Sequence, residues 1–221
     1  MKTSTGTKEH APSTTRLLYG TGNSAKLAAM RGYLRGLGPG FRITGPGEAG
    51  IILPDVPEDG ITPLENARIK ATEYYNAFQM PVFATDSGLY FDGIPEELQP
   101  GVRARRVGGK RLDDAEMTDY YAGLAARFGG RLVCRYINAI CFITETGVYE
   151  HMSEDISGKP FIICDKPHHK RVEGFPLDCL SLRIDTGTYY YDDEKLEEDM
   201  IDLEMNNGFC RFFKDALNLN V

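Results

Sequence analysis

The sequence predicts an α/β protein, because short apolar runs typical of strands alternate with longer segments of helical periodicity. A strand pattern at residues 16–19 leads through glycines into a helical pattern. A second helical pattern at residues 62–78 leads into the apolar run at residues 81–85. Two-residue alternation over residues 132–156, interrupted by Glu-Thr-Gly, indicates a long β-hairpin. Strand–helix alternation followed by a hairpin is typical of this fold class.

The composition is that of a globular protein with one two-lobed domain or two small domains. The chain has 221 residues, of which 42% are hydrophobic and 26% are charged. Its net charge of −7 argues against nonspecific binding to a nucleic-acid backbone, which needs a basic face. A single nucleotide held by a few lysines is compatible with this charge, so we expect no nucleic-acid partner but leave nucleotide binding open.

Several absences in the sequence predict where the protein resides. No apolar run approaches the length of a membrane span, so we expect no membrane partner. Residues 1–15 are polar and are interpreted as a flexible tail, with residues 16–221 forming a single domain. The five cysteines are scattered without a Cys-x-x-Cys pair, which predicts neither a disulfide framework nor a zinc site. The expected location is the reducing cytoplasm.

The first strand–turn–helix unit is a candidate phosphate site. After the strand at residues 16–19, Gly20 and Gly22 form a turn, and Ser24 is the expected N-cap of a helix that ends among the glycines at residues 36–40. Such a turn directs backbone N–H groups and the positive end of the helix dipole towards one point, and Lys26 adds a full charge. A plain strand–helix connection with an exposed lysine explains this stretch equally well.

The second helix has a well-defined start. Residues 41–44 and 51–53 are expected to form a strand pair, and an acidic, proline-rich loop follows at residues 54–60. Thr62 is the predicted cap, Pro63 suits the first helical position, and Glu65 completes a capping box. Glu65 and Lys70 lie about 140° apart around the helix. A helix cap and a solvated lysine are therefore the simplest interpretation of this pair alone.

The stretch at residues 81–89 presents the central candidate. Its apolar run stops at Asp86, so we expect a buried strand that delivers a carboxylate to a sheet edge. Gly88 would allow the backbone to turn sharply there. Taken alone, an Asp-Ser-Gly turn between two strands is the simpler interpretation.

The remainder of the chain predicts scaffold and one basic cluster. Five cations crowd into residues 103–111, and their simplest explanation is a solvated loop paired with neighbouring acids. Asp113 and Asp114 start a predicted helix that ends at the glycines 129–130. We expect a helix led by Asp192 and Asp193, and a last helix near residues 209–217.

Three blocks, in the same order and at matching spacing, resemble the inosine triphosphate pyrophosphatase family, whose members hydrolyse non-standard purine nucleoside triphosphates. The first is Thr-x-Asn-x-x-Lys at residues 21–26, and the second is Glu-Asn-Ala-x-x-Lys-Ala at residues 65–71. The third is the family's Asp-Asp-Ser-Gly-Leu, which reads Thr-Asp-Ser-Gly-Leu at residues 85–89 and is followed by Pro-Gly-Val at residues 100–102.

The resemblance implies a fold and a set of roles. The fold would be a long twisted mixed sheet flanked by helices, with two lobes around a central cleft, in a homodimer. Asp86 would be the general base and, with Glu65, a ligand of Mg²⁺, with Mn²⁺ as a substitute. Substrate-binding roles fall on Thr21, Asn23, Lys26, Lys70, Ser87 and Arg106, with Arg105 as the alternative arginine. The implied products are a nucleoside monophosphate and pyrophosphate.

The chain also departs from the family pattern. Thr85 stands where the family has the first of two acids, which reduces the negative charge expected at the metal. The family's Gly-Phe-Gly-Tyr-Asp-Pro overlies residues 174–179, where Phe175 and Asp178 are retained, and Arg211 is retained from a later base-reading motif. We expect weaker discrimination among bases. A nucleotide-binding module without catalysis, and a related pyrophosphatase with a different base preference, remain alternatives.

Overall fold

The computed structural model describes residues 14–192 and 203–219, in which strands and helices alternate as expected. Residues 1–13 of the tail predicted at residues 1–15, and the predicted helix start at Asp193, lie outside the described residues, whereas Thr15 begins β1. The strands are β1 Thr15–Tyr19, β2 Phe41–Thr44, β3 Val82–Phe91, β4 Arg106–Val107, β5 Lys110–Arg111, β6 Arg131–Thr144, β7 Gly147–His151, β8 Phe161–Cys164 and β9 Ser181–Leu182. The α-helices are α1 Ser24–Tyr33, α2 Pro63–Phe78, α3 Asp114–Arg127 and α5 Leu203–Ala216. Short 3-10 turns are η1 Leu34–Leu37, η2 Glu96–Leu98, η3 Glu154–Ile156, η4 Asp178–Leu180 and η5 Tyr190–Asp192.

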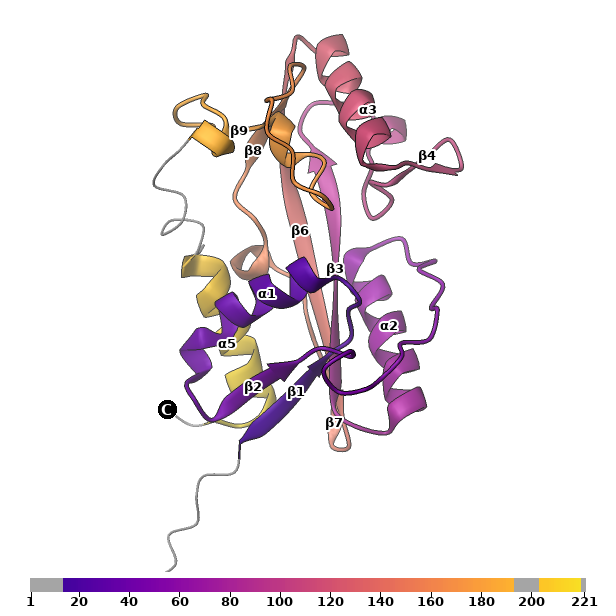
Figure 1. Ribbon diagram of the computed structural model, residues 1–221, viewed down its shortest axis with the longest axis vertical. Coiled ribbons are helices and arrows are strands. Elements are labelled where there is room, and N and C mark those ends of the chain that lie inside the picture. The colour runs from indigo at the N-terminus through magenta and orange to yellow at the C-terminus, as the bar shows by residue number, and fades with distance from the viewer. Residues whose placement is uncertain (1–13, 193–202, 220–221) are drawn as a thin grey trace, which may run out of the picture.

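The main sheet is mixed, which confirms the predicted fold class (Figure 1). Its strand order is β2-β1-β3-β6-β8-β9, with β7 paired to β6. Strand β1 is parallel to β2 and β3, whereas β3 runs antiparallel to β6 from Val82↔Ile143 to Phe91↔Cys134. These two long strands form the axis of the molecule.

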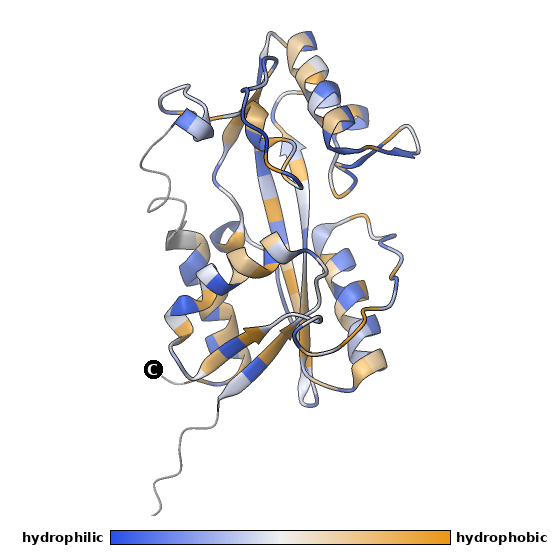
Figure 2. Cartoon of the chain, in the orientation of Figure 1, coloured by the Kyte–Doolittle hydropathy of each residue, from blue (hydrophilic) through white to orange (hydrophobic). Residues whose placement is uncertain are grey.

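Helices pack around this axis in two groups, called here the lower and upper cores after Figure 1. In the lower core, α1 and α5 pack against one face of the sheet around Phe83, and α2 covers the other face around Ala84. In the upper core, α3 and η4 pack against the far ends of β3 and β6 around Tyr121. Figure 2 shows hydrophobic residues gathered on the strands inside both cores. Because β3 and β6 cross both, the cores share one sheet.

Helix α2 begins as predicted. The Thr62 side chain accepts from the Glu65 amide, and the Glu65 carboxylate reaches back to the Thr62 amide, so the capping box is complete. Ala67, Ala71 and Tyr74 are buried along its inner face. The helix ends at Gln79, which adopts a left-handed conformation with φ of 51°.

Three local predictions are wrong. Asn23, rather than Ser24, caps α1, because its side-chain oxygen accepts from the amides of residues 25 and 26. Residues 51–53 form no strand: β2 pairs in parallel with β1, and Ile51 and Leu53 pack as a loop against the α2 core. The last helix starts at Leu203, several residues earlier than expected.

The expected turn at Gly88 is also wrong. Strand β3 continues to Phe91 because β6 pairs with it along its whole length, so Asp86 lies in mid-strand opposite Ala139. Gly88 serves a close approach instead, since a Cβ there would lie 2.6 Å from the Tyr90 ring.

Candidate functional site

The candidate site lies where β1 ends and its parallel neighbour β3 continues. The last link between them is the Gly20 amide, which donates to the Phe83 carbonyl at 2.7 Å. No described strand pairs with this edge of β3 again until Leu89 meets Gly101. A Cβ on Gly20 would lie 2.4 Å from the Tyr74 ring of α2, so only glycine permits this turn. The loop after β1 and the start of α1 therefore lie beside the open edge of β3.

Asp86 forms a buried ion pair at this edge. Its Oδ1 accepts from the Lys70 Nζ at 2.8 Å and its Oδ2 accepts from the Asn66 Nδ2 at 3.0 Å. Asp86 is 6% exposed and Lys70 is 7% exposed, so Lys70 is not the solvated lysine that its sequence position allowed. Removing one partner of such a pair leaves an uncompensated buried charge, which costs about 3–5 kcal/mol.

A second carboxylate converges on the same lysine. Glu58 Oε1 lies 3.3 Å from the Lys70 Nζ, and about half of the Glu58 side chain is exposed. Its loop is fixed because the Gly60 amide donates to the Asn66 Oδ1 at 2.9 Å. The sequence predicts only a loop at residues 54–60, so Glu58 is not among the predicted site residues. The feature that could identify it is the acidity of this loop just before the cap of α2.

Glu65 is engaged in capping α2. Its Oε2 accepts from the Ile61 amide at 2.7 Å and from the Thr62 amide at 3.4 Å. Its role as a metal ligand remains a prediction. The acid that joins Asp86 at Lys70 is Glu58.

The start of α1 adds a cation and two open amides. Within the described residues, the amides of Gly22 and Ser24 donate to no protein acceptor, whereas the Thr21 hydroxyl accepts from the Asn23 amide at 3.1 Å. The pKa of Lys26 is lowered, first because the surrounding protein displaces water from its ammonium group and second because of the positive charge of Lys70. Lys26 as a whole is exposed to water, so the lowered pKa reflects protein atoms close to the ammonium group and not full burial of the residue. The charges of Asp86, Glu58 and Arg105 also affect the pKa of Lys26, so these four residues share one electrostatic environment.

Thr85 and Ser87 point to the face opposite Asp86, as strand alternation requires. The Thr85 hydroxyl lies 2.5 Å from the Tyr19 hydroxyl. Burial raises the pKa of Tyr19 to about 12, so this pair is neutral. Ser87 donates to the Asn138 Oδ1 at 2.7 Å, and its predicted contact with phosphate stays a prediction. The position of the family's first acid is thus part of a neutral hydrogen bond.

Two of the predicted base-binding residues, Phe175 and Asp178, lie together, since the Asp178 amide donates to the Phe175 carbonyl at 3.3 Å. Arg105 donates to Asp114 at 2.7 Å and to the Gly174 carbonyl at 3.3 Å, next to Phe175, which is 38% exposed. Burial raises the pKa of Asp178 to about 6, because the loss of water disfavours the charged carboxylate.

Two further candidates lie apart from the Asp86–Lys70 pair. Arg106 is exposed on β4. Arg211 of α5 pairs with Asp155 of η3 at 3.4 Å and is not brought beside Asp86 by any contact of the described residues. The structure therefore gathers Lys26, Lys70 and Asp86 of the predicted set with Arg105, the alternative arginine, and adds Glu58.

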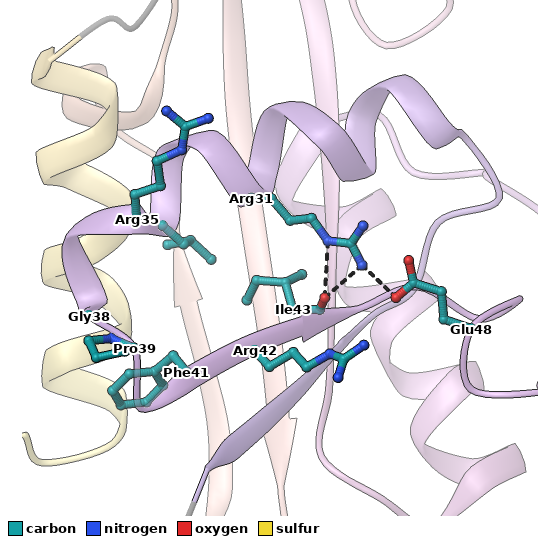
Figure 3. A pocket seen from close by; sticks show the side chains of 9 residues that line it. Arg31, Arg35, Gly38, Pro39, Phe41, Arg42, Ile43 and Glu48 are labelled. Carbon is teal, nitrogen blue, oxygen red and sulfur yellow. Dashed lines mark hydrogen bonds and ion pairs between the residues drawn. The ribbon is translucent and has the colours of Figure 1, made fainter.

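Two grooves border the site, and the first is lined in part by residues 21–24, whose open amides belong to the site. One of about 440 Å³ runs between residues 21–24 and the loop at residues 51–53. A second, of about 540 Å³, lies between α1 and β2 (Figure 3), where Arg31 donates to the Ile43 carbonyl and pairs with Glu48 at 2.5 Å. In this way Arg31 covers the outer edge of β2, beside which the described residues place no further strand.

The described residues contain no group of three or more His, Cys, Asp or Glu side chains able to hold a metal ion. The five cysteines are all buried and free. None of the described helices is both long and apolar enough to cross a membrane.

Fold and site together define an α/β protein that gathers cationic side chains and two carboxylates at the open edge of a central strand. The chain belongs to the Ham1 family, whose family model matches residues 17–180. This result confirms the resemblance to the inosine triphosphate pyrophosphatases.

Curated relatives and solved structures agree with this assignment. The chain is 36% identical over 114 residues to a dITP/XTP pyrophosphatase of Xanthomonas oryzae, covering 50% of this chain and 54% of that protein. It is 32% identical over 153 residues to one of Rhodopseudomonas palustris, covering 67% and 70%. The chain thus spans about half the length of the first curated relatives.

The solved structures support the fold alone, since their identities are low. A HAM1 protein of Coxiella burnetii superposes with a TM-score of 0.67 at 22% identity, covering 91% of this chain and 99% of that one. The Staphylococcus aureus Ham1 protein gives 0.63 at 20% identity, covering 91% and 100%.

Proposed function

We propose that the protein hydrolyses nucleoside triphosphates between the α and β phosphates, releasing a nucleoside monophosphate and pyrophosphate. The observation that supports this most directly is that three cations and two carboxylates share one electrostatic environment. Lys70 pairs with Asp86 and Glu58. The charges of these residues and of Arg105 act on Lys26. Cations bind the phosphate chain, and a carboxylate held in a fixed orientation activates water. Names of the relatives suggest deaminated purine nucleotides such as dITP and XTP as substrates.

In this proposal the chain's own residues perform the proton transfer. Asp86 accepts a proton from water as the water oxygen attacks the α phosphorus, and the bond from this phosphorus to the bridging oxygen breaks as pyrophosphate leaves. Asn66 holds one carboxylate oxygen, which fixes the direction of the other. Lys26 and Lys70 bind the phosphate oxygens, and the open amides of Gly22 and Ser24 add donors at the helix start.

The donor set suits Mg²⁺, with Mn²⁺ as a substitute. Magnesium bound to a nucleotide takes one or two carboxylates and fills its other positions with phosphate oxygens and water. Asp86 and Glu58 satisfy this need without a cluster of three acids, and Glu65 remains the ligand that the family resemblance predicts. When bound, the ion would neutralise charge on the phosphate oxygens.

Base recognition is assigned to Phe175, Asp178 and Arg211 by resemblance alone. Phe175 offers an exposed ring for stacking. A homodimer is expected on the same ground, and light scattering in solution tests it: a monomer at all concentrations would refute it.

A panel of nucleoside triphosphates tests the proposal. The purified protein with Mg²⁺ should release pyrophosphate, fastest from ITP, dITP or XTP, and the Asp86→Asn variant should lose at least about 100-fold in kcat. Because Asp86→Asn also breaks the ion pair with Lys70, thermal unfolding must show that the variant is folded. Release of pyrophosphate from no substrate would refute the enzyme, and full activity in a folded Asp86→Asn protein would refute the assignment of Asp86 as its general base.

A nucleotide-binding module without catalysis is the second candidate, and the neutral Tyr19–Thr85 pair favours it. In that case calorimetry would detect saturable binding of ITP without turnover, weakened by Lys26→Ala. A related enzyme with another base preference would instead cleave pyrimidine or modified nucleotides in the same panel.

A further inference from the structure

Apart from Arg105, the basic cluster at residues 103–111, called here the basic hairpin, has no part in the chemistry above. Strands β4 and β5 pair only with each other, in a two-stranded sheet separate from the main one. Figure 1 shows this hairpin projecting from the upper core on the side where α2 begins. Figure 2 shows it as mostly hydrophilic.

Charges on the basic hairpin are arranged at a cost to its own stability. Arg106 and Arg111 lie directly opposite each other across the strand pair, where like charges repel. In the described part of the chain, no carboxylate lies within ion-pair distance of Arg103, Arg106 or Arg111. By contrast, Lys110 pairs with Glu116. The simple view of a loop neutralised by nearby acids thus explains only part of the cluster.

The hairpin is nevertheless held firmly. Gly108 and Gly109, with φ of 57° and 83°, supply the left-handed turn that a two-residue hairpin requires. At its base, the Leu112 amide donates to the Arg105 carbonyl at 2.8 Å, and Tyr121 of α3 donates to the Ala104 carbonyl at 2.8 Å. Repelling charges are therefore kept close together by the fold.

Arg105 links the basic hairpin to the candidate site. Its guanidinium is fixed by Asp114 and its charge reaches Lys26. Arg103 and Arg106, which have no ion-pair partner among the described residues, lie on either side of Arg105 in the chain. Meanwhile the protein carries a net charge of −7, which repels a nucleoside triphosphate that is itself multiply negative.

We propose that the basic hairpin is an electrostatic guide that captures anionic triphosphates and delivers them to the site at Lys26 and Lys70. This rests on the proposed function. Exposed cations near a site raise the local concentration of an anionic ligand and its association rate, and salt screens the effect within about 10 Å at 0.1 M. The repulsion between Arg106 and Arg111 is the cost of that local field.

The test compares two variants that lose the same charge. Arg103→Gln/Arg111→Gln and Arg16→Gln/Arg42→Gln each lower the net charge from −7 to −9, because each removes two cations. The control arginines are also exposed, but they face each other across β1 and β2 near the start of β1 and away from its carboxyl end. Any effect of net charge alone appears equally in both.

Steady-state kinetics with ITP and Mg²⁺ are measured from low to high salt. At low salt the hairpin variant should lose about 3- to 10-fold in kcat/KM with kcat unchanged, and the loss should disappear near 0.5 M salt. The control should lose less than twofold. Equal losses in both variants, a loss that persists at high salt, or no loss would overturn the guide.

Two further measurements separate this proposal from the function on which it rests. If the wild-type protein cleaves no nucleotide, the association rate of inorganic tripolyphosphate, followed by stopped flow, replaces kcat/KM with the same expected ratio. Thermal unfolding should show no loss of stability in the hairpin variant, since a repulsion is removed. A lowered midpoint with unchanged kinetics would identify a structural element instead, and tight binding of an oligonucleotide with unchanged kinetics would identify a nucleic-acid surface.

Discussion

At the scale of single residues, Asn66 connects the parts of the candidate site. It is 1% exposed, and its amide bridges the Gly60 amide and the Asp86 carboxylate. Replacing it with an apolar residue would leave two buried polar groups without partners, at about 1–3 kcal/mol each. Glu58 and Asp86 are therefore positioned by one shared side chain.

Asp178 makes a measurable prediction at this scale. Burial raises its pKa from 3.8 to about 6, so the folded state binds a proton more readily than the unfolded state. Stability should fall as the pH rises from about 4 to 6, because ionisation costs more in the folded protein. Asp178→Asn should thus stabilise the protein at pH 7 by on the order of 2 kcal/mol and give little gain at pH 4.

Denaturant unfolding at both pH values measures this effect. Asp185→Asn is the control, since Arg183 lowers the pKa of that exposed carboxyl to about 2 and its removal should give no gain at pH 7. An Asp178→Asn protein no more stable than wild type at pH 7 contradicts the prediction. A costly carboxylate that the fold retains is what a ligand-binding role would require.

Some residues of the candidate site could be identified from the sequence and others could not. Lys26, Lys70 and Asp86 could be found because each belongs to one of the three blocks that resemble the family's motifs. Glu58 could not, because its position depends on the hydrogen bond between Gly60 and Asn66, which no periodicity encodes. Arg105 and Arg106 could not be told apart by motif, since only the fold directs one guanidinium to Asp114.

At the scale of elements, the loop before α2 depends on a missing side chain. A Cβ on Gly60 would lie 2.6 Å from the Asn66 Oδ1 and 2.9 Å from the Asn66 amide. Gly60→Ala should therefore displace the loop that carries Glu58. We expect a loss of about 1–3 kcal/mol in stability and a fall in kcat/KM.

Gly47→Ala is the matched control for this loop, because nothing lies within 4 Å of its added Cβ. Urea midpoints and pyrophosphate release compare the two variants. Wild-type stability and activity in Gly60→Ala would mean that the loop adjusts freely. Elements with local signals, such as the capped α2, were predicted correctly, whereas residues 51–53 were not, because an apolar triplet can pack as a loop as well as a strand.

At the scale of the whole molecule, one sheet connects two cores. Strands β3 and β6 pair from Val82↔Ile143 to Phe91↔Cys134, and each contributes side chains to both the lower and the upper core. Separating the cores would require breaking this pairing in its middle, next to Asp86. The described residues should therefore unfold as one cooperative unit, as the single predicted domain implies.

Core substitutions test this coupling. Met30→Ala in the lower core and Leu124→Ala in the upper core remove side chains that are 3% and 2% exposed, and each should cost about 2–4 kcal/mol. Hydrogen exchange during urea unfolding should give one midpoint for peptides of α1 and α3, lowered equally by either substitution. If Leu124→Ala lowers the midpoint of α3 alone, the cores unfold separately. The site at their junction would then depend on an interface between two folding units and not on one continuous sheet.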